Sequence, residues 1–325
     1  MDGISPGAIG GVGEALARPE CVITTLTGDL YVSYCAGNGV GGVSHVDPSG
    51  ATRHIIAKDA PEGFLPNGIA LLPDRSFLIA NLGPTGGVYH LADDGTLTPR
   101  LLEIDGMALP PTNFVGIDTL GRIWVTVSTL QVPREKMMFK GRGDGFVAVM
   151  ESDGANARIV ASDIDFTNEG VVDPSGHWLY VNETMGQRTS RFAIAPNGDL
   201  GPKELVAQYG PGTFPDGLTF DAEGGLWIVS VCSNRVVRTH ADGRQEILVE
   251  DCDPDVLADC IARFDAGECA RPLIDSGGKR SLGNLASIAF GGPDLSTIYL
   301  GTLFCEKILH MPAPVKGAEP VHWRF

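Results

Sequence analysis

The sequence predicts an all-β protein, specifically a six-bladed β-propeller built from four-stranded antiparallel blades. The first observation is composition: 43 Gly and 22 Pro occur among 325 residues. Together they make up one residue in five, against an ordinary share of roughly 12%, which indicates many turns and few long helices. The second observation is a repeat in which a small-residue turn, a short apolar strand, an acidic or Gly turn and a second apolar strand follow one another six times.

The repeat has the period of a propeller blade. Its six copies are PECVITTLTGDLYVS, PNGIALLPDRSFLIAN, TNFVGIDTLGRIWVTV, TNEGVVDPSGHWLYVN, PDGLTFDAEGGLWIVS and ASIAFGGPDLSTIYLG. Their second residues stand at positions 20, 67, 113, 168, 216 and 287, with spacings of 47, 46, 55, 48 and 71. Four spacings match a blade of the usual length, and the last contains an insertion of about 23 residues.

Further strands follow each of the first five copies. Third strands end in turns at 41–50, 86–95, 146–154, 191–198 and 235–243. ARIVAS and QEILVE are candidates for fourth strands, and VHWRF at 321–325 is a candidate outer strand of the last blade. Radial repetition of such blades limits exposed sheet edges. We therefore expect one domain over residues 1–325.

Up-and-down connectivity predicts which loops share a face. The six repeat positions should ring the mouth of the central channel, and the long insertions at about 128–145 and 250–284 should lie on that face as lids. In the second insertion, Asp253 is a candidate N-cap before Pro254, and Gly267 can end the helix. The sequence thus predicts a short helix before the last blade.

Charge and composition exclude several partners. The formal net charge of −16 disfavours nucleic acid, since phosphate binding needs a basic surface. The chain has no run of about 18 apolar residues and no secretion-type start, so we expect no membrane association and no export. Seven cysteines without a CxxC pair predict thiols in a reducing cytoplasm. The oligomeric state is left open.

Polar residues occupy the six mouth positions. They are Glu20, Asn67, Asn113, Asn168, Asp216 and Ser287. Any one of them is an ordinary turn residue, but recurrence at one phase of a radial repeat places them within reach of a common point. Carboxylate and amide oxygens are ligands of hard cations. The chain lacks a GxSxG elbow and an HExxH helix, which are the usual signatures of serine hydrolases and zincins.

Three segments carry a resemblance to a known family. TNFVGIDTLGRIW, TNEGVVDPSGHWLYV and FPDGLTFDAEGGLWIV resemble the SMP-30/gluconolactonase/LRE-like six-bladed propellers, and the resemblance covers about residues 18 to 310. It implies one divalent metal on the axis, held by Glu20, Asn168 and Asp216. It also implies that Asn113 contacts the substrate, and that the activity is lactone hydrolysis.

The chemistry fits these residue types. Two carboxylates and one amide oxygen can bind a divalent ion and balance its charge, and they leave coordination positions open for water and a carbonyl oxygen. The expected ion is Ca²⁺, with Mg²⁺, Mn²⁺, Zn²⁺ or Fe²⁺ as alternatives. Asp216 is the expected general base, and Asn113 is expected to orient the substrate or to stabilise the oxyanion.

The sequence departs in two places from the sugar-lactone enzymes of the family. Pro111 stands where those enzymes often have an Arg, and Leu130, Gln131 and Val132 stand where they tend to carry an acid. Substrate-lining candidates are Asn67, Gln131, Met137, Met138, Phe139 and Ser287. The two methionines and the phenylalanine favour an apolar lactone or ester, unless they only pack the loop on its blade. Two other functions stay open: a non-catalytic propeller that binds a partner and uses the ion as a clamp, and a strictosidine-synthase-like propeller with different chemistry.

Overall fold

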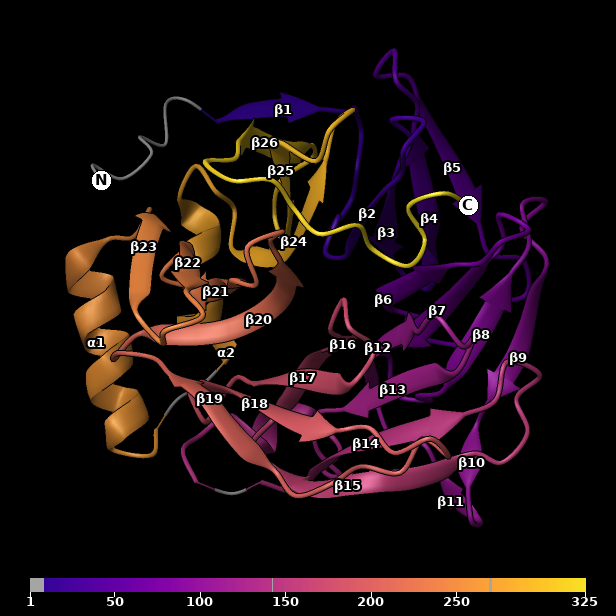
Figure 1. The fold of residues 1–325 in the computed structure, drawn as a ribbon, viewed down its shortest axis with the longest axis horizontal. Coiled ribbons are helices and arrows are strands. Elements are labelled where there is room, and N and C mark those ends of the chain that lie inside the picture. The colour runs from indigo at the N-terminus through magenta and orange to yellow at the C-terminus, as the bar shows by residue number, and fades with distance from the viewer. Residues whose placement is uncertain (1–8, 142, 269–270) are drawn as a thin grey trace.

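Six four-stranded antiparallel sheets form a ring around a central axis in the computed structural model, which describes residues 9–141, 143–268 and 271–325 (Figure 1). The predicted all-β, six-bladed propeller is confirmed. In each of the first five sheets the strands follow one another in chain order from the first strand outward.

Blades one to three contain the following strands. Blade one has β2 (Val22–Thr24), β3 (Leu30–Gly37), β4 (Val40–Val46) and β5 (Thr52–Ile56); blade two has β6 (Pro66–Leu71), β7 (Phe77–Asn81), β8 (Val88–Leu91) and β9 (Leu97–Leu101). Blade three has β12 (Thr112–Ile117), β13 (Ile123–Val127), β14 (Gly145–Met150) and β15 (Arg158–Ile164), preceded by a small hairpin of β10 (Glu103–Ile104) and β11 (Met107–Ala108).

Blades four to six complete the ring. Blade four has β16 (Thr167–Val172), β17 (Trp178–Glu183), β18 (Arg188–Ala193) and β19 (Glu204–Gln208); blade five has β20 (Thr213–Phe220), β21 (Leu226–Cys232), β22 (Arg235–Thr239) and β23 (Gln245–Val249). Blade six has β24 (Leu285–Gly291), β25 (Thr297–Thr302), β26 (Ile308–Pro312) and β1 (Gly10–Val12). The innermost strands contact one another around the axis, as β12 does with β6 and β16.

An acidic turn joins the first two strands of several blades. Asp118 accepts hydrogen bonds from two backbone amides of its own turn and, at 3.0 Å, from the indole Nε1 of Trp124. Gly121 has a φ of 79°, which suits a residue without Cβ. Blade five repeats the arrangement with Asp221 and Trp227 at 2.7 Å. The Asp and Gly of the repeat therefore set the hairpin that buries the tryptophan.

The ring closes differently from the expectation for VHWRF. Residues 321–324 form turns, and the outer strand of blade six is β1, which pairs antiparallel with β26. The C-terminal segment instead crosses the ring from blade six towards blade one (Figure 1). There Trp323 is buried, and its carbonyl accepts a hydrogen bond from the Leu26 amide at 2.8 Å. Closure by the N-terminal strand leaves the C-terminal segment to cover one end of the channel.

The predicted helix is α1 (Pro254–Asp265), and the Asp253 side chain caps it by accepting from the amides of Asp255 and Val256. The helix buries Phe264 edge-on against Phe214 of blade five, with ring centroids 5.1 Å apart. The same insertion continues with α2 (Arg271–Ile274) and η3 (Asp275–Lys279), and the first insertion contains η2 (Arg134–Met137).

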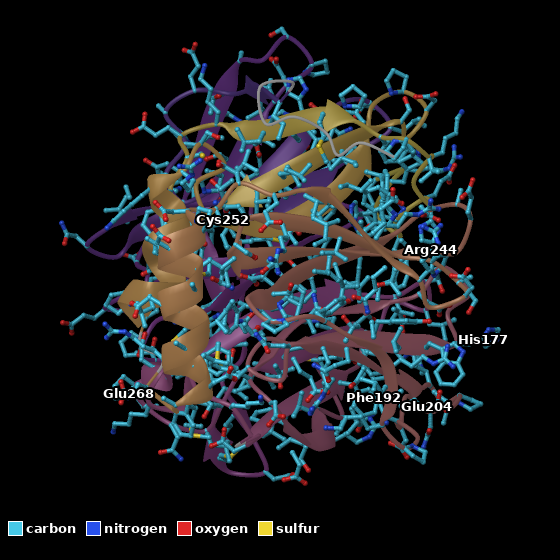
Figure 2. All side chains as sticks on the ribbon, turned by 90° about the vertical axis from the view of Figure 1, so that its left-hand side faces the viewer. His177, Phe192, Glu204, Arg244, Cys252 and Glu268 are labelled. Carbon is cyan, nitrogen blue, oxygen red and sulfur yellow. The ribbon has the colours of Figure 1, made fainter. Side chains whose placement is uncertain are left out.

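The two faces of the ring differ in what covers them. Figure 2 shows α1 on one side, between Cys252 and Glu268, while His177 and Arg244, from tight turns within blades four and five, lie on the opposite side. Among the described residues, the six cysteines outside position 269 form no disulfide, and Cys269 lies outside the described residues. No described helix has the length and apolar character needed to cross a membrane.

Candidate active site

The inner strands break their pairing at the positions predicted to line the mouth. The ladder is interrupted across Asn67 in β6, Asn113 in β12, Asn168 in β16 and Asp216 in β20. A bulge of this kind releases a residue from the pleat and redirects its side chain. These four side chains, together with Glu20 just before β2, line one small chamber on the axis, with an open volume of about 30 Å³.

Four oxygen atoms in this chamber have no hydrogen-bond partner among the described residues. They are Glu20 Oε2, Asn113 Oδ1, Asn168 Oδ1 and Asp216 Oδ1, and all are buried. The two amides are held by their nitrogens: Asn113 Nδ2 donates to Ser128 Oγ at 3.1 Å, and Asn168 Nδ2 donates to Thr184 Oγ1 at 3.0 Å. Because buried acceptors are costly to leave unpaired, the convergence of four of them indicates a ligand.

Burial disfavours the ionised forms of the two carboxylates, Glu20 and Asp216. Burial, followed by the neighbouring charge of Glu20, raises the pKa of Asp216 well above its usual value. Burial also raises the pKa of Glu20, although Arg18 opposes the shift. The charges of Arg18, Arg134 and Arg271 oppose both shifts without reversing them. A cation bound directly to the carboxylate oxygens would favour their ionised forms further.

Asn67 lines the chamber, but both polar atoms of its side-chain amide have hydrogen-bond partners. Its Nδ2 donates to the Asn113 carbonyl oxygen at 2.8 Å, and its Oδ1 accepts from Arg18 Nη2 at 2.7 Å. Asn67 therefore joins blades two and three behind the chamber wall, and it offers no unpaired oxygen comparable to those of Asn113 and Asn168.

Ser287 does not line the chamber, although the repeat spacing predicted that it would. The bulge of β24 falls between Leu285 and Ser287, so Ala286 is the residue equivalent to Asp216. Ser287 lines a larger cavity of about 350 Å³ further along the channel, together with Cys21 and Glu169. A shift of one residue along a strand moves a side chain to another environment, and spacing alone did not detect it.

The first insertion contributes less apolar surface than expected. Met138 lines the chamber, whereas Met137 packs beside it in a cluster that includes Phe214 and Phe264. Phe139 is partly buried outside the chamber wall. Gln131 is exposed and contacts Asp144 of the same insertion at 3.5 Å.

Sequence reasoning missed the three arginines of the chamber. Arg18 precedes Glu20 by two residues, Arg134 comes from the first insertion and Arg271 from the second. The insertions were recognised as important, but nothing in their spacing distinguished these arginines from surface residues. Thr184 and Ser128 were also missed, because their role of holding the two amides appears only when strands of one blade are paired.

The donor set fits a hard divalent cation. Within the described part of the chain, no cluster of three or more His, Cys, Asp or Glu side chains is arranged to hold a metal. The chamber instead combines two carboxylates with two amide oxygens, each with an unpaired oxygen. All-oxygen sets of this kind suit Ca²⁺, Mg²⁺ or Mn²⁺ better than soft metals.

These features define a class: six-bladed β-propellers with an oxygen-lined chamber on the axis. The chain belongs to the SMP-30/Gluconolactonase/LRE-like family, whose model matches residues 41–250. The family resemblance in the sequence is thus confirmed.

Curated relatives match part of the chain. The chain is 29% identical over 161 residues to a 6-deoxy-6-sulfogluconolactonase from Pseudomonas putida, covering 49% of this chain and 52% of the relative. It is 28% identical over 174 residues to Pentonolactonase XacC from Haloferax volcanii, covering 49% and 50%. The chain therefore spans about half the length of the curated relatives it matches.

Solved structures share the fold over nearly the whole chain. A calcium-binding protein, regucalcin, from Agrobacterium tumefaciens is 18% identical with a TM-score of 0.68, covering 98% of each chain. A gluconolactonase from Xanthomonas campestris is 17% identical with a TM-score of 0.65, covering 93% of this chain and 88% of the other. At these identities the likeness concerns the fold.

Proposed function

We propose that this protein is a metal-dependent lactonase, an ester hydrolase that opens a cyclic ester. The observation that carries the proposal is the convergence of four buried, unpaired oxygens from Glu20, Asn113, Asn168 and Asp216. The family and the two lactonase relatives support lactone hydrolysis, and the regucalcin neighbour supports calcium.

Glu20, Asn168 and Asp216 would hold the divalent cation, with Asn113 beside them. The ion supplies a Lewis acid that polarises the lactone carbonyl and favours ionisation of water. Calcium is our first choice, and Mg²⁺, Mn²⁺, Zn²⁺ and Fe²⁺ are alternatives for the metal analysis to separate.

The residues of the chain have distinct tasks. Asp216 accepts the proton of the attacking water on a carboxylate oxygen, because its carboxylate lines the chamber in which the water would be bound. Asn113 orients the substrate by presenting Oδ1 as an acceptor for a hydroxyl group. Because its Nδ2 is bound to Ser128, this orientation does not favour the oxyanion-stabilising task.

The two insertions complete the site. The open volume of about 30 Å³ is close to that of one water molecule, so a lactone enters only when one of the two insertions that cover the chamber shifts. Because residues of the ring and of both insertions line the chamber together, we propose that they act as one domain, residues 1–325.

The three arginines of the chamber wall weigh against the apolar lactone that Met137, Met138 and Phe139 suggested.

A cytoplasmic location stays a prediction, which the unbridged cysteines favour.

The test is a lactone panel with and without chelator. The panel contains D-glucono-1,5-lactone, D-xylono-1,4-lactone and the apolar dihydrocoumarin, and a pH indicator follows hydrolysis. We expect turnover of at least one sugar lactone, a loss of at least about 100-fold after EDTA treatment, and recovery with Ca²⁺. Thermal melting in parallel shows whether the fold survives the chelator.

Other results contradict the proposal. Calcium that raises the melting temperature without turnover of any lactone would indicate the non-catalytic, clamped propeller. Turnover that resists EDTA, with no bound metal by elemental analysis, would reject metal dependence. A product in which two substrates are joined would favour condensation chemistry of the strictosidine-synthase type.

A further inference from the structure

The chamber is positively charged in a protein whose overall charge is −16. Its wall contains three arginines, Arg18, Arg134 and Arg271, against two carboxylates, Glu20 and Asp216. A divalent cation on the carboxylates would increase the positive excess further. Glu169 lines the neighbouring cavity and is not part of the chamber wall.

The arginines are not the ion-pair partners of these carboxylates. Among the described residues, no nitrogen of the three lies within the 4.0 Å ion-pair distance of a Glu20 or Asp216 oxygen. Arg18 donates instead to the Pro66 carbonyl at 3.2 Å and to Asn67 at 2.7 Å. Its guanidinium therefore supports the wall, and the other two face the remaining space.

Arg134 is the exception among the buried cations. Its side chain is only 9% exposed, its Nε and Nη1 have no hydrogen-bond partner among the described residues, and its guanidinium stacks over the Phe166 ring at 4.8 Å. Leaving a buried guanidinium unpaired is expensive. The stacking holds the plane in place, so its unpaired edge is ready for an acceptor.

Arg271 approaches the same chamber from the other insertion. Its Nε donates to both oxygens of Asp275, at 2.7 and 2.8 Å, which orients the side chain, and its terminal nitrogens have no hydrogen-bond acceptor among the described residues. Two guanidiniums from separate insertions repel each other unless an anion lies between them. A planar or tetrahedral oxyanion is the group that their fork geometry binds best.

We propose that Arg134 and Arg271 form an anion clamp, so that the preferred substrate is a lactone with an ionised carboxylate or sulfonate away from the ring carbonyl. This inference rests on the proposed lactonase function and adds the substrate class. The carbonyl lies at the oxygen-lined base of the chamber, and the anionic group lies under the two lids.

The test compares two lactones that differ only at C6. D-Glucono-1,4-lactone ends in a hydroxymethyl group, and D-glucaro-1,4-lactone ends in a carboxylate. We expect wild-type kcat/KM to favour the glucarolactone at least about tenfold, and R134Q to reduce this preference at least about tenfold. R134K, which keeps the charge but loses the fork, should retain part of the preference.

Lys136→Gln is the matched control. It removes one positive charge two residues away, from an exposed side chain that contacts only the Val132 carbonyl among the described residues, and it should keep the wild-type preference. Equal turnover of both lactones by the wild type, or an equal change for both in R134Q, would overturn the clamp. Loss of preference in K136Q would show a long-range field instead of a clamp.

A binding measurement separates this inference from the lactonase proposal. Calorimetry with Ca²⁺ present compares D-glucarate, with two carboxylates, and D-gluconate, with one. We expect glucarate to bind at least about tenfold more tightly, with the difference lost in R134Q and R271Q. If this holds while no lactone is hydrolysed, the clamp stands and the enzyme proposal fails. Equal binding of both acids overturns the clamp even if lactones are hydrolysed.

Discussion

Glu183 in blade four and Asp216 in blade five are buried carboxylates near arginines, yet their surroundings differ completely. Glu183 Oε1 accepts from Arg188 Nε at 2.9 Å and from Ser190 at 2.5 Å, while its Oε2 accepts from Arg188 Nη2 at 2.6 Å and from the Asp165 amide at 3.0 Å. Asp216 Oδ1 has no partner among the described residues.

The pKa values of the two carboxylates move in opposite directions, because donors surround Glu183 and leave one oxygen of Asp216 unpaired. Burial alone would raise the pKa of Glu183, but hydrogen bonds from Arg188 and Ser190 hold it below its usual value. Burial and the charge of Glu20 raise the pKa of Asp216. The comparison teaches that the blade-four cluster of Glu183, Arg188, Ser190 and Asp165 satisfies its own polar groups, whereas the axial chamber keeps unpaired oxygens among the described residues.

Asp216→Asn should give the largest effect. We expect kcat/KM for the best lactone to fall about 10³-fold, because the variant loses the general base and one anionic ligand. The melting temperature without metal should be unchanged or higher, since repulsion with Glu20 disappears. Asp165→Asn makes the same chemical change in the blade-four cluster and should keep activity per folded molecule. Full activity in D216N would remove Asp216 from the mechanism.

Glu183→Gln should affect stability instead of activity. The side chain is fully buried, and loss of its charge should cost about 3 kcal/mol at pH 7, measured by urea unfolding. A lowered folded-state pKa contributes stability that is present above the unfolded pKa of about 4.3 and is lost as pH falls through the folded value. The variant should therefore lose less stability than the wild type between pH 5 and 3. If the unfolding free energies of the two proteins fell equally between pH 5 and 3, this account would be contradicted.

Asp253→Ala tests the lid with the smallest expected effect. The side chain caps α1 by accepting from two backbone amides, at 3.0 and 3.2 Å. Its removal should lower the local opening free energy of α1 by about 1 kcal/mol, seen as faster hydrogen exchange in the helix and not in the blades. Asp259→Ala, which only breaks an exposed pair with Arg263, is the control and should change exchange much less. Equal acceleration in the two variants would argue against the cap.

Much of the fold was predictable because the propeller repeats. Each blade carries its own apolar strands, several blades carry an Asp and Gly turn, and Pro254 after Asp253 marks the start of α1. These are local effects that neighbouring residues control. Ring closure was not predictable, because β1 and VHWRF both carry weak strand patterns and only competition for β26 decides between them.

The site was predicted in part. The repeat phase brought Glu20, Asn67, Asn113, Asn168 and Asp216 to one chamber, as the structure places them. It placed Ser287 one residue away from the equivalent position, because a bulge in β24 does not show in spacing.

The sequence by itself determined the number of blades, the face that carries the two insertions and the polar character of the axis, because these follow from period, turn residues and residue type. The tertiary structure alone decided which oxygens stay unpaired and which arginines face them. Asn67 and Asn113 are the same residue type at the same phase, but Asn67 donates to the next blade and has no unpaired oxygen, whereas Asn113 donates to Ser128 of its own blade and keeps Oδ1 unpaired. Such differences arise from contacts between segments far apart in the chain, where local pattern has no influence.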